Sequence, residues 1–288
     1  MIQYLYLGRA PYDDALRLQT EIADLLYHGR VENVLLLLEH PPVLTLGRNA
    51  RRGNILASDE LLAQRGVTIH EINRGGDVTY HGPGQLIGYP IFDLRSLLNS
   101  SGGRLGPVDF VRMMEEALIR LCGVYGVRAG RLAGLTGVWS GSSDQPQTPS
   151  KTPPPAGKIG AIGIHVARGI TSHGFAFNVT TDLRDFQLIN PCGITDRPVT
   201  SLEREVPNPT TLPTLEAIAH EAARQFGHVF SQQILAVESL DALRSQNLPT
   251  KAHSPAPEVP PRVPEDTPVQ VPPEVERLRH APHRPERA

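Results

Sequence analysis

Residues 157–179, which read GKIGAIGIHVARGITSHGFAFNV, are the stretch of sequence that most clearly indicates the fold. Branched and aromatic side chains fill two runs, 159–166 and 169–179, and a third run follows at 182–188. Glycine or short polar turns separate the runs, which predicts successive β-strands. Alternate residues of a strand face opposite sides. One face of the first strand therefore begins with the amine of Lys158 and continues with small or apolar side chains, which suits the edge of a lipid pocket.

The rest of the chain alternates helical and extended patterns. Apolar residues at helical spacing predict an amphipathic helix over 12–27, with two aspartates suited to its first turn. The unbroken apolar run at 34–38 is typical of a strand buried on both faces. The predicted fold class is therefore α/β, with a mixed β-sheet and packed helices. Further helices are predicted over 108–124 and 214–226, and further strands over 43–46, 67–72 and 86–92.

Length and composition predict one folded domain over 1–248. With 288 residues and 40% hydrophobic composition, the chain can bury a sizeable core. A polar, proline-rich surface insertion is expected within the domain at about 140–156. From 249 to 288 the sequence is rich in proline and charge and poor in large apolar side chains, so this tail is expected to be disordered. A proline-rich ligand for a partner is the alternative interpretation of the tail.

Charge and cysteine content indicate which partners and which cellular compartment to expect. The formal net charge of −2 gives no global basic field, so nucleic acid is not an expected partner. The first residues lack a basic segment followed by an apolar one, and no apolar run reaches about 18 residues, so no membrane association or export is expected. The two cysteines, Cys122 and Cys192, cannot form a disulfide framework. The sequence thus predicts a soluble protein of the reducing cytoplasm, with Cys122 buried in a helix.

Cys192 lies in the segment Ile189-Asn190-Pro191-Cys192-Gly193-Ile194, in a turn rather than on an apolar face. Proline fixes φ there, and glycine lets the backbone come close to a ligand. A thiol attacks as its thiolate, and because a free thiol has a pKa of about 8.5 it needs a base or a positive charge nearby. Lys158 supplies that charge if the fold brings the two together. The alternative interpretation is a small buried hydrophobic residue.

A second unusual block, residues 74–86, reads RGGDVTYHGPGQL. Its glycines and proline make the backbone irregular and rigid, as expected where a backbone wraps closely around a ligand. The block matches neither of the common phosphate-binding loop patterns. A tight turn between two strands is the alternative interpretation.

Four segments together resemble the octanoyltransferases of lipoate biosynthesis, the lipoyl(octanoyl)-[acyl-carrier-protein]:protein transferases. They occur in the family's order and cover roughly residues 1–230. The resemblance implies the fold shared by the catalytic domains of biotin and lipoate protein ligases. It also implies an acyltransferase that performs the first step of endogenous lipoate biosynthesis. The four segments are residues 74–86, 157–163 (GKIGAIG), 173–179 (HGFAFNV) and 189–193 (INPCG).

The same resemblance implies a role for most candidate site residues. Cys192 takes the octanoyl (or lipoyl) group as a thioester, and Lys158 is the charge partner that keeps the thiol reactive. The histidines are candidates on their own surroundings and not through the resemblance: His81 and His173 are polar groups in glycine-rich settings, and either is expected to assist proton transfer or to orient the acyl carbonyl. Plain structural hydrogen bonding is the alternative for both. The residues implied to line the acyl pocket are Arg74, Gly75, Gly76, Asp77, Val78, Thr79, Tyr80, His81, Ala161, Ile162, Gly163, Gly174, Phe175 and Ala176.

The implied partners are octanoyl-acyl carrier protein as donor and, as acceptors, the lipoyl domains of 2-oxoacid dehydrogenases and the H protein of glycine cleavage. No cofactor is implied, and no metal is predicted because the histidine and cysteine spacing fits no metal motif. Three rival functions share some of these features: a thiol hydrolase, an ATP-dependent lipoate or biotin protein ligase on the same fold, and a non-catalytic lipoyl-domain binding protein. The pair of Cys192 and Lys158 favours the transferase. Acyl chain length and oligomeric state are left open.

Overall fold

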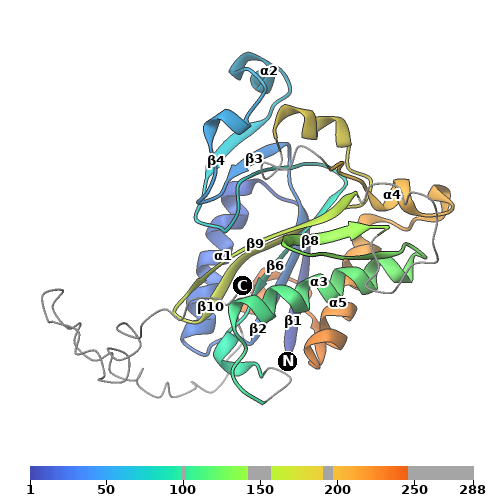
Figure 1. Ribbon diagram of the computed structural model, residues 1–288. Helices are drawn as coiled ribbons and strands as arrows, with labels where there is room; N and C mark the ends of the chain where they lie inside the picture. The colour runs from blue at the N-terminus through green and yellow to red at the C-terminus, as the bar shows by residue number, and fades with distance from the viewer. Residues whose placement is uncertain (99–101, 142–156, 191–196, 246–288) are drawn as a thin grey trace, which may run out of the picture. The chain divides into compact units, whose positions relative to one another are not determined.

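The structure is a computed structural model that describes residues 1–98, 102–141, 157–190 and 197–245. Within these residues two β-sheets form the framework (Figure 1). The larger has eight strands in the order β11-β1-β2-β6-β10-β9-β8-β7, and the smaller has three in the order β4-β3-β5. The strands of the larger sheet are β1 Ile2–Arg9, β2 Asn33–Glu39, β6 Gln85–Ile91, β7 Ala129–Leu132, β8 Leu135–Ser140, β9 Lys158–Ala167, β10 Ile170–Asn178 and β11 Ile234–Ala236.

The larger sheet is mixed, as predicted. β1 runs parallel to both β2 and β11, whereas the pairs from β2 to β7 are antiparallel. The interior strand β2, with sequence NVLLLLE, is buried at six successive positions. Such a strand has core on both sides, which is why its sequence does not alternate. The apolar run at 34–38 was therefore interpreted correctly.

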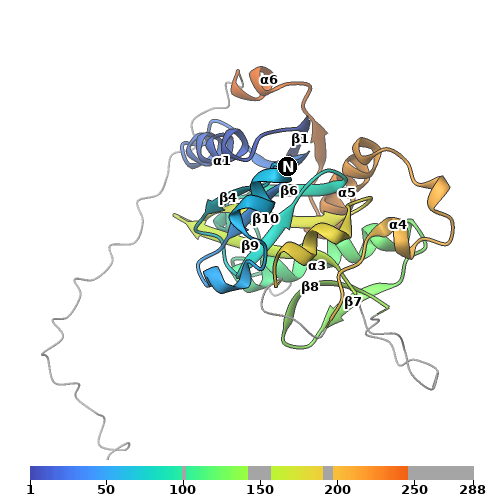
Figure 2. The same ribbon diagram turned by 90° about the horizontal axis from the view of Figure 1, so that it is seen from above.

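Helices cover the two faces of this sheet (Figures 1 and 2). Helix α1 (Tyr12–Tyr27) and the short α6 (Leu240–Arg244) pack on one face, where Ile22, Leu26 and Leu243 join the core. Helices α3 (Pro107–Val124) and α5 (Leu215–Phe230) pack on the other face. The sheet thus has two separate cores, one on each side.

Local sequence sets where these helices begin. Asp13 and Asp14 lie in the first turn of α1, where carboxylates interact favourably with the helix dipole. Pro107 opens α3, because its fixed φ suits the first helical position. Thr214 caps α5 by accepting a hydrogen bond from the Ala217 amide.

The smaller sheet stands beside the larger one and carries its own core. Its strands are β3 (Val43–Leu46), β4 (Thr68–Glu71) and β5 (Val78–His81), and the short helix α2 (Asp59–Gln64) connects β3 to β4. Leucines, valines and aromatic residues of these elements pack with the segment 183–189. The block at 74–86 thus contains strand β5, the turn at 82–84 and the first two residues of β6, so it holds both irregular backbone and a turn between strands.

Strands β9 and β10 form the antiparallel hairpin that the stretch 157–179 predicts. Their register pairs Phe177 with Gly160 and Ala176 with Ala161. Arg168 and Gly169 turn the chain between them, both with positive φ. At the start of β9, the Ser140 N–H donates to the Gly157 carbonyl at 2.8 Å, so the two ends of the segment between β8 and β9 are hydrogen-bonded.

Most predicted elements are confirmed to within a few residues, and one is wrong. Residues 182–188 form a 3₁₀ helix, η3 (Leu183–Leu188), rather than a strand. The Asp182 carboxylate caps it by accepting a hydrogen bond from the Arg184 amide, and this local bond competes with strand pairing. Four strands, β1, β7, β8 and β11, are not predicted by the local sequence pattern.

The insertion predicted at about 140–156 falls, apart from its first two residues, outside the described residues. The predicted tail at 249–288 lies wholly outside them. Both remain predictions from composition. In the part of the chain that the structure describes, each helix is too short or too polar to cross a lipid bilayer.

Candidate active site

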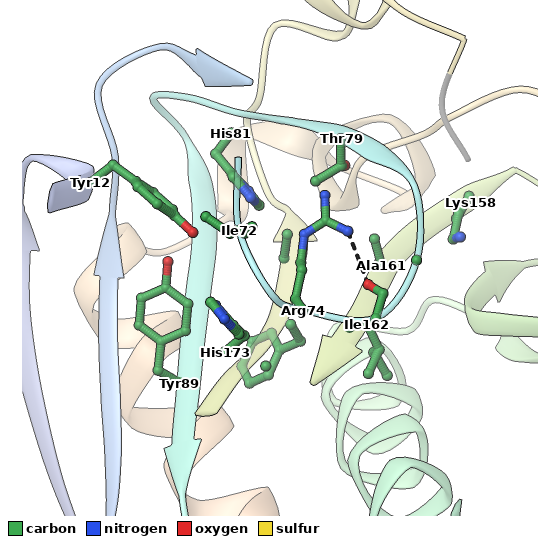
Figure 3. A pocket seen from close by; sticks show the side chains of 16 residues that line it. Tyr12, Ile72, Arg74, Thr79, His81, Tyr89, Lys158, Ala161, Ile162 and His173 are labelled. Atoms are coloured by element: carbon green, nitrogen blue, oxygen red, sulfur yellow. Dashed lines mark hydrogen bonds between the residues drawn. The ribbon is translucent and has the colours of Figure 1, made fainter. Parts of the chain in front are cut away.

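A cavity lies between the larger sheet and the smaller one, beside the first turn of α1 (Figure 3). About 510 Å³ of space, open solvent at its mouth included, lies between its walls. Strands β9 and β10 form its floor, and the loop before β5 covers it. The residues that line it are Tyr12, Ile72, Arg74, Gly75, Gly76, Thr79, His81, Tyr89, Lys158, Ala161, Ile162, Gly163, His173, Gly174, Phe175 and Ala176.

Small side chains on the floor leave room for a ligand. Phe175 and Phe177 of β10 belong to the core under α3 and α5, so the alternate position Ala176 faces the other side. Ala161 of β9 lies beside Ala176 in the register, and Gly163 follows two residues later. The floor is thus on the strand face opposite to the one predicted from simple alternation with Lys158, because the register of β9 against β8 shifts next to Lys158. A floor of alanine and glycine suits a slender apolar chain.

The loop that covers the cavity is tied to both sheets. The Gly75 N–H donates to the Ile164 carbonyl at 3.0 Å. A Cβ at Gly163 would lie 2.7 Å from the Gly75 oxygen, so glycine is required for this close approach. Arg74, only 8% exposed, donates through Nη2 to the Thr45 carbonyl (2.6 Å) and hydroxyl (2.9 Å). The guanidinium therefore fastens the loop to β3.

Lys158 lies at one end of the cavity (Figure 3). Its Nζ is 5.3 Å from the centroid of the Trp139 ring, a cation–π contact. A Cβ at Gly137 would lie 2.8 Å from Lys158 Cε, so the lysine stem packs directly against this glycine. The Lys158 N–H donates to the Pro198 carbonyl (2.9 Å), and its carbonyl accepts from the Thr200 N–H (3.0 Å). Main chain and side chain of Lys158 are thus both held in place.

A buried carboxylate on α3 is hydrogen-bonded to the strand next to Lys158 at this end of the cavity. Glu115 of α3 is fully buried, and its Oε1 accepts a hydrogen bond from the Gly137 N–H at 2.9 Å. Its Oε2 accepts from Arg112 (2.7 Å) and Arg131 (3.0 Å), which balances the buried charge. The Glu115 carboxylate therefore fixes Gly137 of β8, against which the Lys158 side chain packs.

His81 and His173 line the cavity as uncharged rings. Burial lowers the pKa of His81 to about 3 and that of His173 to about 4. His81 Nδ1 donates to Gln85 Oε1 (2.8 Å), and His173 Nε2 donates to Asn73 Oδ1 (2.7 Å). Both rings thus make structural hydrogen bonds. Among the described residues, no group of three His, Cys, Asp or Glu side chains is placed to hold a metal ion.

Tyr12, Ile72 and Tyr89 line the cavity but were not identified from the sequence. Tyr12 opens an amphipathic helix and Tyr89 lies in a buried strand, so each has the pattern of an ordinary core residue. Only the packing of α1 beside β6 places both at the cavity (Figure 3). The only local sign of a cavity in the sequence is that two positions with the hydrophobic pattern of core residues carry tyrosine, whose side chain has a hydroxyl.

Three residues implied to line the acyl pocket lie elsewhere. The Asp77 carboxylate accepts hydrogen bonds from Asn54 and from the Val78 amide. Val78 is buried in the core of the smaller sheet. The Tyr80 hydroxyl donates to Asp185 at 2.7 Å. Because side chains alternate along β5, Thr79 and His81 face the cavity and these neighbours face away.

Cys192 lies outside the described residues, but the chain on both sides of it is described. Before it, the Asn190 N–H donates to the Asn54 carbonyl at 2.7 Å. After it, Pro198 accepts the hydrogen bond from Lys158. On the C-terminal side of Cys192 the chain is therefore hydrogen-bonded, through Pro198, to the backbone of Lys158 at the end of the cavity.

Comparison with known proteins places the chain among relatives that share most of its length. The model of the lipoyl protein ligase A/B catalytic domain matches residues 11–225. A protein of Acidobacterium capsulatum named octanoyltransferase is 60% identical over 242 residues, which covers 83% of this chain and 94% of the relative. The octanoyltransferase of Koribacter versatilis is 49% identical over 278 residues, covering 96% and 97%.

Solved structures show the same fold at low identity. A bipartite lipoate protein ligase from Thermoplasma acidophilum, described with its E2 lipoyl domain, has a TM-score of 0.59 at 16% identity, covering 85% of this chain and 90% of that one. A lipoate-protein ligase A bound with ATP has a TM-score of 0.54 at 17% identity, covering 83% and 89%. The chain belongs to the lipoyl protein ligase A/B catalytic-domain family and, within it, to the octanoyltransferases.

Proposed function

We propose that the chain moves an octanoyl group from acyl carrier protein, through a thioester on Cys192, to a lysine of a lipoyl domain. Octanoyl transfer in protein lipoylation is the activity that the names of its relatives support. The observation that carries the assignment to this site is the cavity itself. Its floor is formed by Ala161, Gly163 and Ala176, and Lys158 lines one end of it.

In the proposed first step, the Cys192 thiolate attacks the carbonyl carbon of the donor thioester. A carbon–sulfur bond forms to Cys192 and the bond to the donor sulfur breaks. The departing thiolate takes a proton from the Lys158 ammonium, which becomes a neutral amine. A lysine suits this role because it holds a charge beside the thiolate and can also give up a proton.

In the second step, the neutral amine of the acceptor lysine attacks the Cys192 thioester. A carbon–nitrogen bond forms and the carbon–sulfur bond breaks. The proton lost by the attacking nitrogen goes to Lys158, which restores the thiolate and ammonium pair. The contacts of Lys158 with Trp139 and Gly137 support this role, because they hold the amine at the end of the cavity instead of leaving it free in solvent.

The acceptor and donor are proposed on different grounds. The archaeal ligase of the same fold is described with an E2 lipoyl domain, which supports lipoyl domains as acceptors here. Acyl carrier protein as donor follows from the sequence resemblance. ATP is not required, because a thioester already provides an activated acyl group.

The test is the intact mass of the full chain after mixing with octanoyl-acyl carrier protein without ATP. We expect the added mass of one octanoyl group, which moves to an apo lipoyl domain when that is supplied. Cys192→Ala should show neither event. Cys122→Ala is the matched control and should behave as wild type, because Cys122 is fully buried in α3 and burial raises the pKa of its thiol.

Three results would contradict the proposal. Near-normal transfer by Cys192→Ala would exclude the covalent route. A strict need for ATP would indicate a ligase, and release of free octanoate in place of transfer would indicate a hydrolase.

A further inference from the structure

Trp139 is fully buried on β8, directly beside Lys158. The register of β8 and β9 pairs the two residues, and the lysine Nζ is 5.3 Å from the centroid of the indole ring. Lys158 lines the cavity, whereas Trp139 does not. The indole therefore affects a ligand in the cavity only through the lysine.

The indole N–H of Trp139 is not used. Its Nε1 is buried and makes no hydrogen bond to any described residue. A buried tryptophan usually finds a partner for this group, because an unpaired buried donor lowers stability. Phenylalanine would bring an aromatic ring to this place without that cost. The advantage of tryptophan here therefore lies in its ring and not in its donor.

The face of the indole is what distinguishes it from the other aromatic rings. Tryptophan binds a cation on its ring face more strongly than tyrosine or phenylalanine, and the attraction acts within about 6 Å of the ring centroid. The Lys158 ammonium lies inside that distance. Because the indole is completely shielded from water, the contact is stronger than a cation–π contact at an exposed site.

No carboxylate among the described residues competes with the ring for the amine. Within that part of the chain, the Lys158 side chain makes neither an ion pair nor a hydrogen bond. The carboxylates of the neighbouring elements have other partners: Glu115 is neutralised by two arginines, and Glu205 accepts a hydrogen bond from the Thr200 hydroxyl at 2.6 Å. The second cation that lines the cavity, Arg74, is bonded to β3.

A ring face suits a lysine that must change its charge during a reaction. A carboxylate beside the amine would hold the ammonium strongly and would compete for the proton that the amine releases. A ring face attracts the ammonium more weakly and accepts no proton. The amine can therefore be charged at rest and still exchange its proton during transfer.

We propose that Trp139 is a positioning residue that takes the place of a counter-ion for Lys158. Its ring face holds the ammonium at the end of the cavity and favours the charged form of the amine. Through that charge it stabilises the thiolate of Cys192. This inference rests on the proposed function for the pairing of Lys158 with Cys192.

The test uses the fact that Trp139 is the only tryptophan of the chain. A fluorinated tryptophan supplied during expression changes this position alone. Fluorine withdraws electron density from the ring face and nearly keeps its shape, and the indole N–H has no hydrogen bond to lose. The measurement is the pH dependence of Cys192 alkylation in the full chain, together with the transfer rate at neutral pH.

The alkylation midpoint should move to higher pH in the order tryptophan, monofluorotryptophan, difluorotryptophan, and transfer should slow in the same order. Trp139→Leu removes the ring and should give the full shift of about 0.4–1.5 pH units, the range for loss of a cation–π contact.

Two controls separate this effect from general damage. Phe92→Leu also shortens a fully buried aromatic side chain, but Phe92 packs against Phe110 and Phe230 and does not line the cavity. It should lose stability and keep the alkylation profile. In Lys158→Met, fluorination should leave the profile unchanged, because the charge through which the ring acts is gone.

An alkylation profile that does not respond to fluorination, or that responds equally in Lys158→Met, would overturn the inference. If Lys158→Ala shifts the profile and fluorination does not, the role of Trp139 is wrong and the proposed function stands. Alkylation requires no octanoyl donor. Failure of the chain to take up an octanoyl group is therefore a separate result, which counts against the proposed function alone.

Discussion

Gly137 shows how one residue without a side chain holds the amine of Lys158 in place. Its φ is +124°, a value that favours glycine, and its N–H is fixed by the buried Glu115 carboxylate. The stem of Lys158 packs on its Cα. Position and orientation of the amine therefore depend on a residue that takes no part in the chemistry.

We expect Gly137→Ala to slow transfer at least about tenfold and to lower the free energy of unfolding by about 1–3 kcal/mol. The new Cβ would meet Gly160 O at 2.5 Å and Lys158 Cε at 2.8 Å. The matched control is Gly134→Ala in the preceding turn, which also has positive φ but open space around it. It should lose stability and keep transfer. Equal transfer rates in the two variants would contradict the positioning role.

Replacing Lys158 tests the charge that it provides. In Lys158→Ala the Cys192 thiolate loses its cation, so alkylation of Cys192 should shift to higher pH and acylation at neutral pH should slow by orders of magnitude. Lys158→Arg should restore part of the alkylation profile but little transfer, because arginine does not give up its proton. The measurement is the pH dependence of alkylation in the three proteins. Identical profiles would exclude the pairing.

Strands β9 and β10 together determine what the cavity accepts, because their small side chains form its floor. Ala161→Leu should fill that space and reduce octanoyl transfer at least about tenfold, while a butanoyl donor is affected much less. Stability should change by less than about 1 kcal/mol, since the added atoms enter empty space. Ala167→Leu, at the exposed end of the same strand, is the control and should transfer octanoyl normally. A uniform loss for both donors would contradict this role.

The sequence allowed the strands that build the floor to be predicted, because alternation and glycine turns are local signals. The run at 182–188 was misread because its apolar residues resemble a strand, whereas the Asp182 side chain caps a 3₁₀ helix. Tyr12 and Tyr89 were not predicted as site residues, since their positions depend on how α1 packs beside β6. Local patterns identify elements, and only packing shows which buried hydroxyl faces a cavity.

At the scale of the folded domain, the described residues include three buried, neutral histidines at or beside the cavity: His40, His81 and His173. Burial lowers their pKa values to about 4, 3 and 4, below the value of about 6.5 in an unfolded chain. Above pH 6.5 both states are neutral and this contribution to stability is complete. As the pH falls, only the unfolded chain gains protons, so stability should decrease by up to about 1.4 kcal/mol per pH unit for each histidine.

Urea unfolding of the full chain between pH 7.5 and 5 checks this expectation. His40→Gln should show a shallower loss on acidification than wild type. His28→Gln, which replaces an exposed histidine at the end of α1, should follow the wild-type curve. A stability that does not change over this range would show that the buried rings are not the cause.

The proline-rich tail, residues 249–288, is predicted to be unnecessary for folding and for transfer. Deleting residues 249–288 should leave the melting temperature and the transfer rate unchanged within error, because the segment has no apolar periodicity with which to dock. The measurements are thermal unfolding and transfer to an apo lipoyl domain. A large loss of either would show that the tail packs on the domain or recruits the acceptor.

The hydrogen bond from Ser140 to Gly157 has a consequence for engineering. It joins the two ends of the segment between β8 and β9, just before Lys158, and the lysine is bonded on its other side to Pro198 and Thr200. We therefore expect a change of length between those two ends to leave the position of the Lys158 amine unchanged. On this expectation, a fluorescent reporter or an affinity tag inserted between them should leave the transfer rate within about twofold of wild type.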